Sequence, residues 1–142
     1  MDDNKKNLKG SERRDAFKCW HKTLSRFFYA CDLDFVFIVK DPPKIAAVLD
    51  YKREREQVTF AEVIAYNHLL ECKIPIYLIS TDPDMPDESI EGGYKSITIR
   101  QYLGGDWHPE PPVVETKIIK QNITVAEYED WEQSIRYPPN NV

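Results

Sequence analysis

The sequence predicts a single α/β domain in which a mixed β-sheet is flanked by helices. Apolar residues recur at helical spacing in the N-terminal part, and short apolar runs bounded by turn residues follow. One of these runs is separated from the next by a helix-like segment, which is typical of α/β proteins. With 142 residues, the chain has the usual length of one domain and can bury one hydrophobic core.

The N-terminal region is polar at first and then has the pattern of an amphipathic helix. We expect residues 1–10 to form a flexible N-terminus and residues 11–142 to form the domain. Ser11 and Glu12 have the character of a helix start. The apolar positions that follow share one stripe of this predicted helix: Phe17, Trp20, Leu24, Phe27, Phe28 and Cys31.

Two strands joined by a tight turn are predicted next. Residues 34–39 have the composition of a strand, and residues 45–51 have that of a second, buried strand. Pro42 and Pro43 lie in the short segment between them and favour a turn. A hairpin is therefore expected.

A helix and a third strand should follow the hairpin. Thr59 and Glu62 have the spacing of a capping box, in which each side chain bonds the backbone amide of the other residue. The helix should extend to about Lys73, and residues 74–80 should form a strand. Because a helix connects the second and third strands, the two should be parallel.

The C-terminal half gives a second set of elements. We expect, in chain order, an acidic loop over 81–94, a strand over 96–103, a turn-rich segment over 104–112, a strand over 113–120 and a helix over 124–136.

Composition and charge limit the classes of function. No apolar segment approaches the roughly 20 residues that a membrane helix needs, and the N-terminus lacks the apolar core of a secretion signal. We therefore expect a cytoplasmic protein with no membrane partner. The net charge of −5 argues against a protein that coats nucleic acid by charge alone. Contact with nucleic acid would require a local basic patch.

Three charged residues should converge at one end of the predicted hairpin. Asp34 begins the first strand, and Asp50 and Lys52 lie at the end of the second. Residues two apart share a face of a strand, and the hairpin returns that face beside Asp34. Two carboxylates can hold Mg²⁺ or Mn²⁺ for phosphodiester hydrolysis, and a lysine can orient the attacking water and neutralise developing charge.

This arrangement resembles the PD-(D/E)xK nuclease superfamily, whose core is restriction-endonuclease-like. Leu33-Asp34 stands at its Pro-Asp position and Asp50-Tyr51-Lys52 at its (D/E)xK position, within a match over about residues 12–80. The usual proline before the first acid is absent, and the second acid is Asp rather than the commoner Glu. The resemblance implies a metal-dependent endonuclease that acts on nucleic acid, DNA rather than RNA. Asp34 and Asp50 would be its metal ligands, and Lys52 a catalytic residue.

The resemblance also suggests further candidates. Members often add an acidic residue from the first helix and a polar residue from the helix after the motif, which makes Glu12 and Tyr66 candidate catalytic residues. Small nucleases of this type often act as homodimers. Independently, a basic rim near the site would bind phosphates, and its candidates are Lys44, Arg53 and Arg55.

Other interpretations remain open. Asp50 and Lys52 also fit a strand-end ion pair, in which case the chain is an inactive nuclease-fold module for nucleic-acid binding or protein assembly. If the motif is a coincidence, the chain is an unrelated α/β interaction protein.

Metal and base-stacking interpretations of other residues are weaker. His68 and Cys72 are four residues apart and could bind zinc from one face of a helix. Their possible partners, Cys19 and His21, are two residues apart on another helix and point in different directions, so we expect no zinc site. The aromatic side chains of the C-terminal half could stack on bases, although packing is their commoner use: Trp107, Tyr128, Trp131 and Tyr137.

Overall fold

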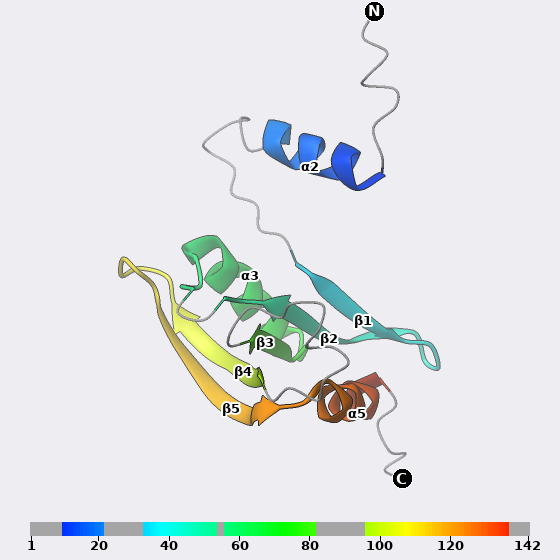
Figure 1. Ribbon diagram of the computed structural model, residues 1–142. Coiled ribbons are helices and arrows are strands. Elements are labelled where there is room, and N and C mark those ends of the chain that lie inside the picture. Colours follow the sequence, from blue (N-terminus) through cyan, green and yellow to red (C-terminus); the bar gives the residue numbers. More distant parts are fainter. Residues whose placement is uncertain (1–9, 22–32, 54–55, 82–95, 137–142) are drawn as a thin grey trace, which may run out of the picture. The chain divides into compact units, whose positions relative to one another are not determined.

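The chain divides into two compact units, Met1–Ala30 and Cys31–Val142. The first unit has one described helix, and the second has a five-stranded mixed sheet and two described helices (Figure 1). The predicted α/β class with a mixed sheet is confirmed. None of these helices is long and apolar enough to cross a membrane. The computed structural model describes residues 10–21, 33–53, 56–81 and 96–136.

Helix α2 (Gly10–His21) is the described element of the first unit. It includes Gly10, which the sequence placed in the N-terminal tail, and Glu12 lies in its first turn, where a negative charge is favourable. The rings of Phe17 and Trp20 lie 5.5 Å apart, and both side chains are exposed. Residues 1–9 and the rest of the predicted apolar stripe, from Leu24 onward, lie outside the described residues.

The sheet of the second unit has the strand order β1-β2-β3-β4-β5. Strands β2 and β3 are parallel, and every other neighbouring pair is antiparallel. The parallel pair is the one that a helix connects, as predicted. The strands are β1 (Phe35–Val39), β2 (Lys44–Tyr51), β3 (Ile76–Thr81), β4 (Ile97–Asp106) and β5 (Val113–Ile123).

The predicted hairpin is confirmed in β1 and β2. Phe35 pairs with Leu49 and Val39 with Lys44, so the start of β1 lies beside the end of β2. This register follows from the short turn that Pro42 and Pro43 favour. It brings the residue that precedes β1, Asp34, to the end of β2.

Helix α3 (Phe60–Glu71) covers one face of the sheet. Thr59 and Glu62 form the predicted capping box, with both reciprocal bonds present. Tyr66, fully buried, packs edge-on against Tyr102 of β4, with the ring centroids 5.1 Å apart. The core on this face contains Val48, Val58, Val63, Tyr66, Ile76, Leu78 and Tyr102.

Helix α5 (Val125–Arg136) packs on the opposite face. Leu49 and Ile79 point to this face, because they alternate with Val48 and Leu78, which face α3. Trp131 packs edge-on against Tyr77 at 4.9 Å between ring centroids. Trp131 and Tyr128 of α5 therefore pack against the sheet, as the commoner use of aromatic residues suggested. Tyr137 lies outside the described residues.

Strand β4 extends further than the sequence predicted. It continues through Gly104 and Gly105 to Asp106, where turn-rich composition suggested a loop. The register with β5 shifts between Tyr102 and Gly104, and Gly104 has a φ of +146°, which glycine adopts readily. At Gly105, an added Cβ would lie 2.7 Å from the hydroxyl oxygen of Tyr102. The glycines thus permit a bulged strand rather than a turn.

Candidate functional site

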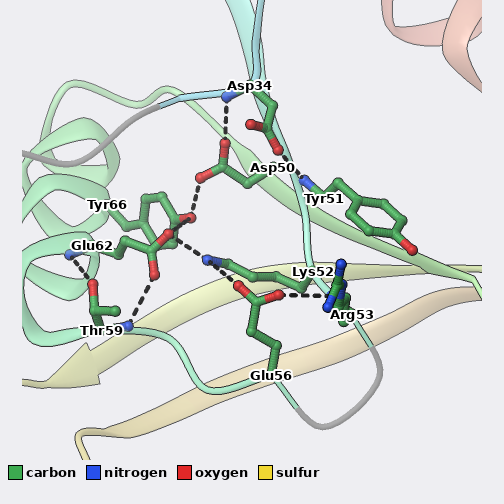
Figure 2. Close-up of polar contacts among 9 residues, drawn as sticks. All are labelled: Asp34, Asp50, Tyr51, Lys52, Arg53, Glu56, Thr59, Glu62 and Tyr66. Carbon is green, nitrogen blue, oxygen red and sulfur yellow. Dashed lines mark hydrogen bonds and ion pairs between the residues drawn. The ribbon is translucent and has the colours of Figure 1, made fainter. Parts of the chain in front are cut away.

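The candidate site lies at the end of β2. Asp50 and Lys52 both point toward α3, whereas Tyr51 between them points to the other face (Figure 2). Asp50 is 2% exposed and Lys52 is 9% exposed. The backbone N–H of Lys52 donates to the carbonyl of Ile79 at 2.8 Å, which fixes this strand end against β3. Two ionisable side chains are therefore held in a largely buried place.

Asp34 joins the end of β2 through two hydrogen bonds. The backbone N–H of Asp34 donates to Oδ1 of Asp50 at 2.7 Å, and the backbone N–H of Tyr51 donates to Oδ2 of Asp34 at 2.7 Å. Figure 2 shows the two carboxylates side by side, with Asp34 on the exposed side. The structure thus brings Asp34 and Asp50 together, as the hairpin was expected to do.

Helix α3 adds two polar side chains to this group. The Tyr66 hydroxyl donates to Oδ2 of Asp50, and its oxygen also lies 3.4 Å from Oε2 of Glu62. The Lys52 ammonium donates to the same Glu62 oxygen and lies 3.6 Å from Oε2 of Glu56 (Figure 2). Asp50, Tyr66, Glu62 and Lys52 therefore form one continuous polar network beneath the helix start.

Glu62 is the site residue that sequence reasoning missed. It was assigned only to the capping box, and its Oε1 does accept the Thr59 N–H at 2.9 Å. Its other oxygen serves a different purpose, because it accepts from Lys52 across the helix–strand contact. The available signal was the position of this glutamate. It is the third residue of α3, and this helix packs on the sheet near the end of β2, which Lys52 follows.

Burial raises the pKa of Asp50 above its usual value. Hydrogen bonds from Tyr66 and from the Asp34 amide, and the charge of Lys52, lower this pKa, while the negative charge of Asp34 adds to the increase. Desolvation has a larger effect on the Asp50 pKa than the contacts that lower it. The folded protein therefore holds an Asp50 charge that its surroundings do not fully compensate.

We expect Asp50→Asn to raise the free energy of unfolding at pH 7 by about 1 kcal/mol. The folded state binds the Asp50 proton more tightly than the unfolded state, so stability falls as pH rises from the unfolded pKa through the raised folded pKa. Asparagine removes this penalty. The gain in unfolding free energy should be smallest below the pKa of Asp50 in the unfolded state, and it should reach a plateau above the pKa of Asp50 in the folded state. Urea unfolding of both proteins across this pH range measures it, and a pH-independent difference would contradict the explanation.

The Glu62 carboxylate behaves in the opposite way. Its burial alone would raise the pKa, but the hydrogen bond from Lys52, the Thr59 backbone N–H and the Lys52 charge together lower it below the usual value. Glu62 is therefore held as an anion, and it compensates the buried Lys52 ammonium.

Of the other predicted site residues, one lies beside the candidate site, one lies at the far end of β2, one lies in the first unit and one lies outside the described residues. Arg53 follows Lys52 directly, and its backbone N–H donates to Oε1 of Glu56 at 3.0 Å. Lys44 was expected near the site, and this was wrong. Lys44 is the first residue of β2 and Asp50 is its seventh, so the two lie about 20 Å apart along the strand. Glu12 lies on α2 in the first unit. Arg55 lies outside the described residues.

Similarity to known proteins gives no further indication of the chemistry. No family model, curated protein or solved structure matches the chain. The site must be interpreted from its own residues.

The donor atoms of the site fit a small divalent cation. Carboxylate oxygens are the ligands that Mg²⁺ and Mn²⁺ prefer, and each Asp50 oxygen accepts one hydrogen bond, which leaves it a further lone pair. A cation would also compensate the buried Asp50 charge. No group of three or more His, Cys, Asp or Glu that could hold a metal occurs among the described residues. Magnesium commonly takes only one or two protein carboxylates, with water and substrate phosphate as its other ligands.

Proposed function

We propose that this chain is a metal-dependent nuclease of the PD-(D/E)xK type, which hydrolyses phosphodiester bonds in nucleic acid, with DNA as the first substrate to test. The observation that carries the proposal is the pair of adjacent carboxylates, Asp34 and Asp50, with Lys52 beside them on the same strand face as Asp50. A buried acid with a raised pKa is costly for folding and is common where a carboxylate has a chemical task.

The roles of the carboxylates follow from their contacts. Asp34 and Asp50 would hold Mg²⁺ or Mn²⁺, which when bound makes a water molecule more acidic and stabilises charge on the phosphate. The Tyr51 N–H fixes the orientation of Asp34, and the Tyr66 hydroxyl and Asp34 N–H fix that of Asp50. Both ligands are thus oriented before any substrate binds, which reduces the cost of assembling the site.

Lys52 would orient the attacking water and donate a hydrogen bond to the phosphate oxygens on which negative charge develops. Its ammonium has three donors, and contacts with Glu62 and Glu56 hold it in place. Attack by the water oxygen forms one P–O bond while the water releases a proton to solvent, and the bond between phosphorus and the leaving sugar oxygen breaks as that oxygen takes up a proton. A lysine held rigidly beside the reacting phosphate contributes because little reorganisation is needed.

A second candidate function has a specific observation in its favour. Lys52 is mostly buried and paired with Glu62, which fits a structural ion pair in an inactive nuclease-fold module for nucleic-acid binding or assembly. The two functions differ in whether Asp50 binds a metal and whether the chain cuts nucleic acid.

Metal binding is tested first by thermal unfolding, because this readout does not require activity. With Mn²⁺ or Mg²⁺ at 100 times its Kd, the folded state should gain about 2.7 kcal/mol, which raises Tm by several degrees. Asp50→Asn should abolish this increase, because it removes a ligand charge. Unchanged Tm values in Mg²⁺ and Mn²⁺, together with no cleavage of DNA or RNA, would move the assignment to the inactive module.

A further inference from the structure

A cleft with both polar and apolar lining residues opens beside Lys52, over β3, β4 and β5. Its volume is about 480 Å³, and Ser80 and Arg100 line it together with Lys52. Leu78 pairs with Asp50 on one side and with Arg100 on the other, so these three side chains share a face of the sheet. The cleft is therefore continuous with the candidate site on the face that carries Asp50.

Arg100 lines this cleft together with two other cations, Lys52 and Arg53. Its Nη1 donates to Oγ of Ser80 at 3.4 Å, and it has no carboxylate within 4 Å among the residues that the structure describes. By contrast, Glu62 and Glu56 already offset the charge of Lys52. A guanidinium held on a strand and lacking an acidic partner is suited to a phosphate, which it can bind through two parallel N–H bonds.

A second hollow adjoins the cleft. It has a volume of about 460 Å³, and the two hollows share Gln57, Val58, Pro111 and Pro112 in their linings. Trp107 and His108 line the second hollow, with their rings stacked at 3.9 Å between centroids. Trp107 is 43% exposed, so part of its indole surface remains open to solvent. Among the described residues, the first hollow is lined by three cationic side chains and Glu56, and the second is lined by Glu110 as its one acidic side chain. An exposed aromatic surface beside a cationic side chain is typical of binding sites for single strands.

We infer that these two hollows form one track for a single nucleic-acid strand, in which Arg100 binds a backbone phosphate and Trp107 stacks on a base. The inference rests on the proposed function, because the track leads away from the Asp50–Lys52 site. Because the chain has a net charge of −5, this contact is local, and Arg100 on β4 supplies its positive charge.

The test measures binding in the full chain with Asp50→Asn, so that cleavage does not consume the probe. The probes are fluorescein-labelled oligo(dT) and oligo(U) of about 12 nucleotides and a DNA duplex of the same length. Adding Arg100→Gln should weaken binding of the single strands about tenfold and reduce the slope of log K against log salt by about 1. Arg100→Lys keeps the charge but not the bidentate geometry, and should give an intermediate Kd.

Trp107→Ala should also weaken single-strand binding about tenfold, but it should leave the salt slope unchanged because stacking releases no counterions. The matched control is Lys117→Gln, which removes one charge from β5. Lys117 pairs with Gln101, which lies on the other face of the sheet from Arg100. The control should bind like the parent, and circular dichroism verifies that each variant is folded.

Failure of the inference is distinguishable from failure of the proposed function. Metal-dependent cleavage by the unmodified chain, with single-strand binding unaffected by Arg100→Gln and Trp107→Ala, would overturn the track and leave the nuclease intact. Binding that both substitutions weaken, without cleavage by any form of the chain, would support the track and overturn the nuclease. Stronger binding of the duplex than of either single strand would also overturn a track for one strand.

Discussion

Asp50→Asn is expected to lower the rate of metal-dependent cleavage by about 1000-fold or more at neutral pH, with the fold intact. Asparagine keeps the shape of the side chain and can still accept the Asp34 N–H, but it removes a ligand charge. A metal ion contributes several kcal/mol to stabilising transition-state charge in such reactions, and each 1.36 kcal/mol changes the rate tenfold. The measurement is cleavage of duplex, single-stranded and branched DNA and RNA in Mg²⁺ and Mn²⁺.

Asp130→Asn is the matched control for this loss of activity. Asp130 is exposed on α5, which packs on the sheet face opposite to Asp50. The same change of charge there should leave the cleavage rate unchanged. Equal cleavage by the unmodified chain and by Asp50→Asn would assign the activity to a contaminant or to another site.

The part of the site that lies within the hairpin was predictable from the sequence. The alternation of a strand places Asp50 and Lys52 on one face, and a short turn returns the start of the first strand to the end of the second. These are local constraints, and the observed pairing of Phe35 with Leu49 satisfies them. The same is true of the capping box, since Thr59 and Glu62 are only three residues apart.

The contacts made across elements were not predictable in the same way. The bond between Glu62 and Lys52 depends on how α3 packs on β2, and no periodicity in the sequence specifies that distance. Arg100 escaped notice for the same reason, because its place beside Lys52 requires β4 to lie next to β3. Lys44 was wrongly placed in the basic rim, because it lies at the turn end of the hairpin and the length of β2 separates it from Asp50.

Breaking the Lys52–Glu62 pair is expected to have the largest effect on stability. Lys52→Met should lower the free energy of unfolding at pH 7 by about 3 kcal/mol or more, because the Glu62 carboxylate is left buried and without its cation. Glu62→Gln should cost less, since Lys52 keeps Glu56 at 3.6 Å. The double variant Lys52→Met/Glu62→Met should recover most of the loss, because it removes both charges and keeps the volume apolar.

The pH dependence gives this prediction a second readout. Because the folded pKa of Glu62 is lowered, the pair contributes stability above the unfolded pKa of glutamate, and that contribution is lost as pH falls through the folded pKa. Without Lys52, the buried carboxyl becomes easier to protonate, so the cost of Lys52→Met should shrink toward pH 4. Lys117→Met, at an exposed position on β5, should change stability by less than about 0.5 kcal/mol. Urea unfolding measures all four variants, and a cost below about 1 kcal/mol for Lys52→Met at pH 7 would contradict a buried, mutually dependent pair.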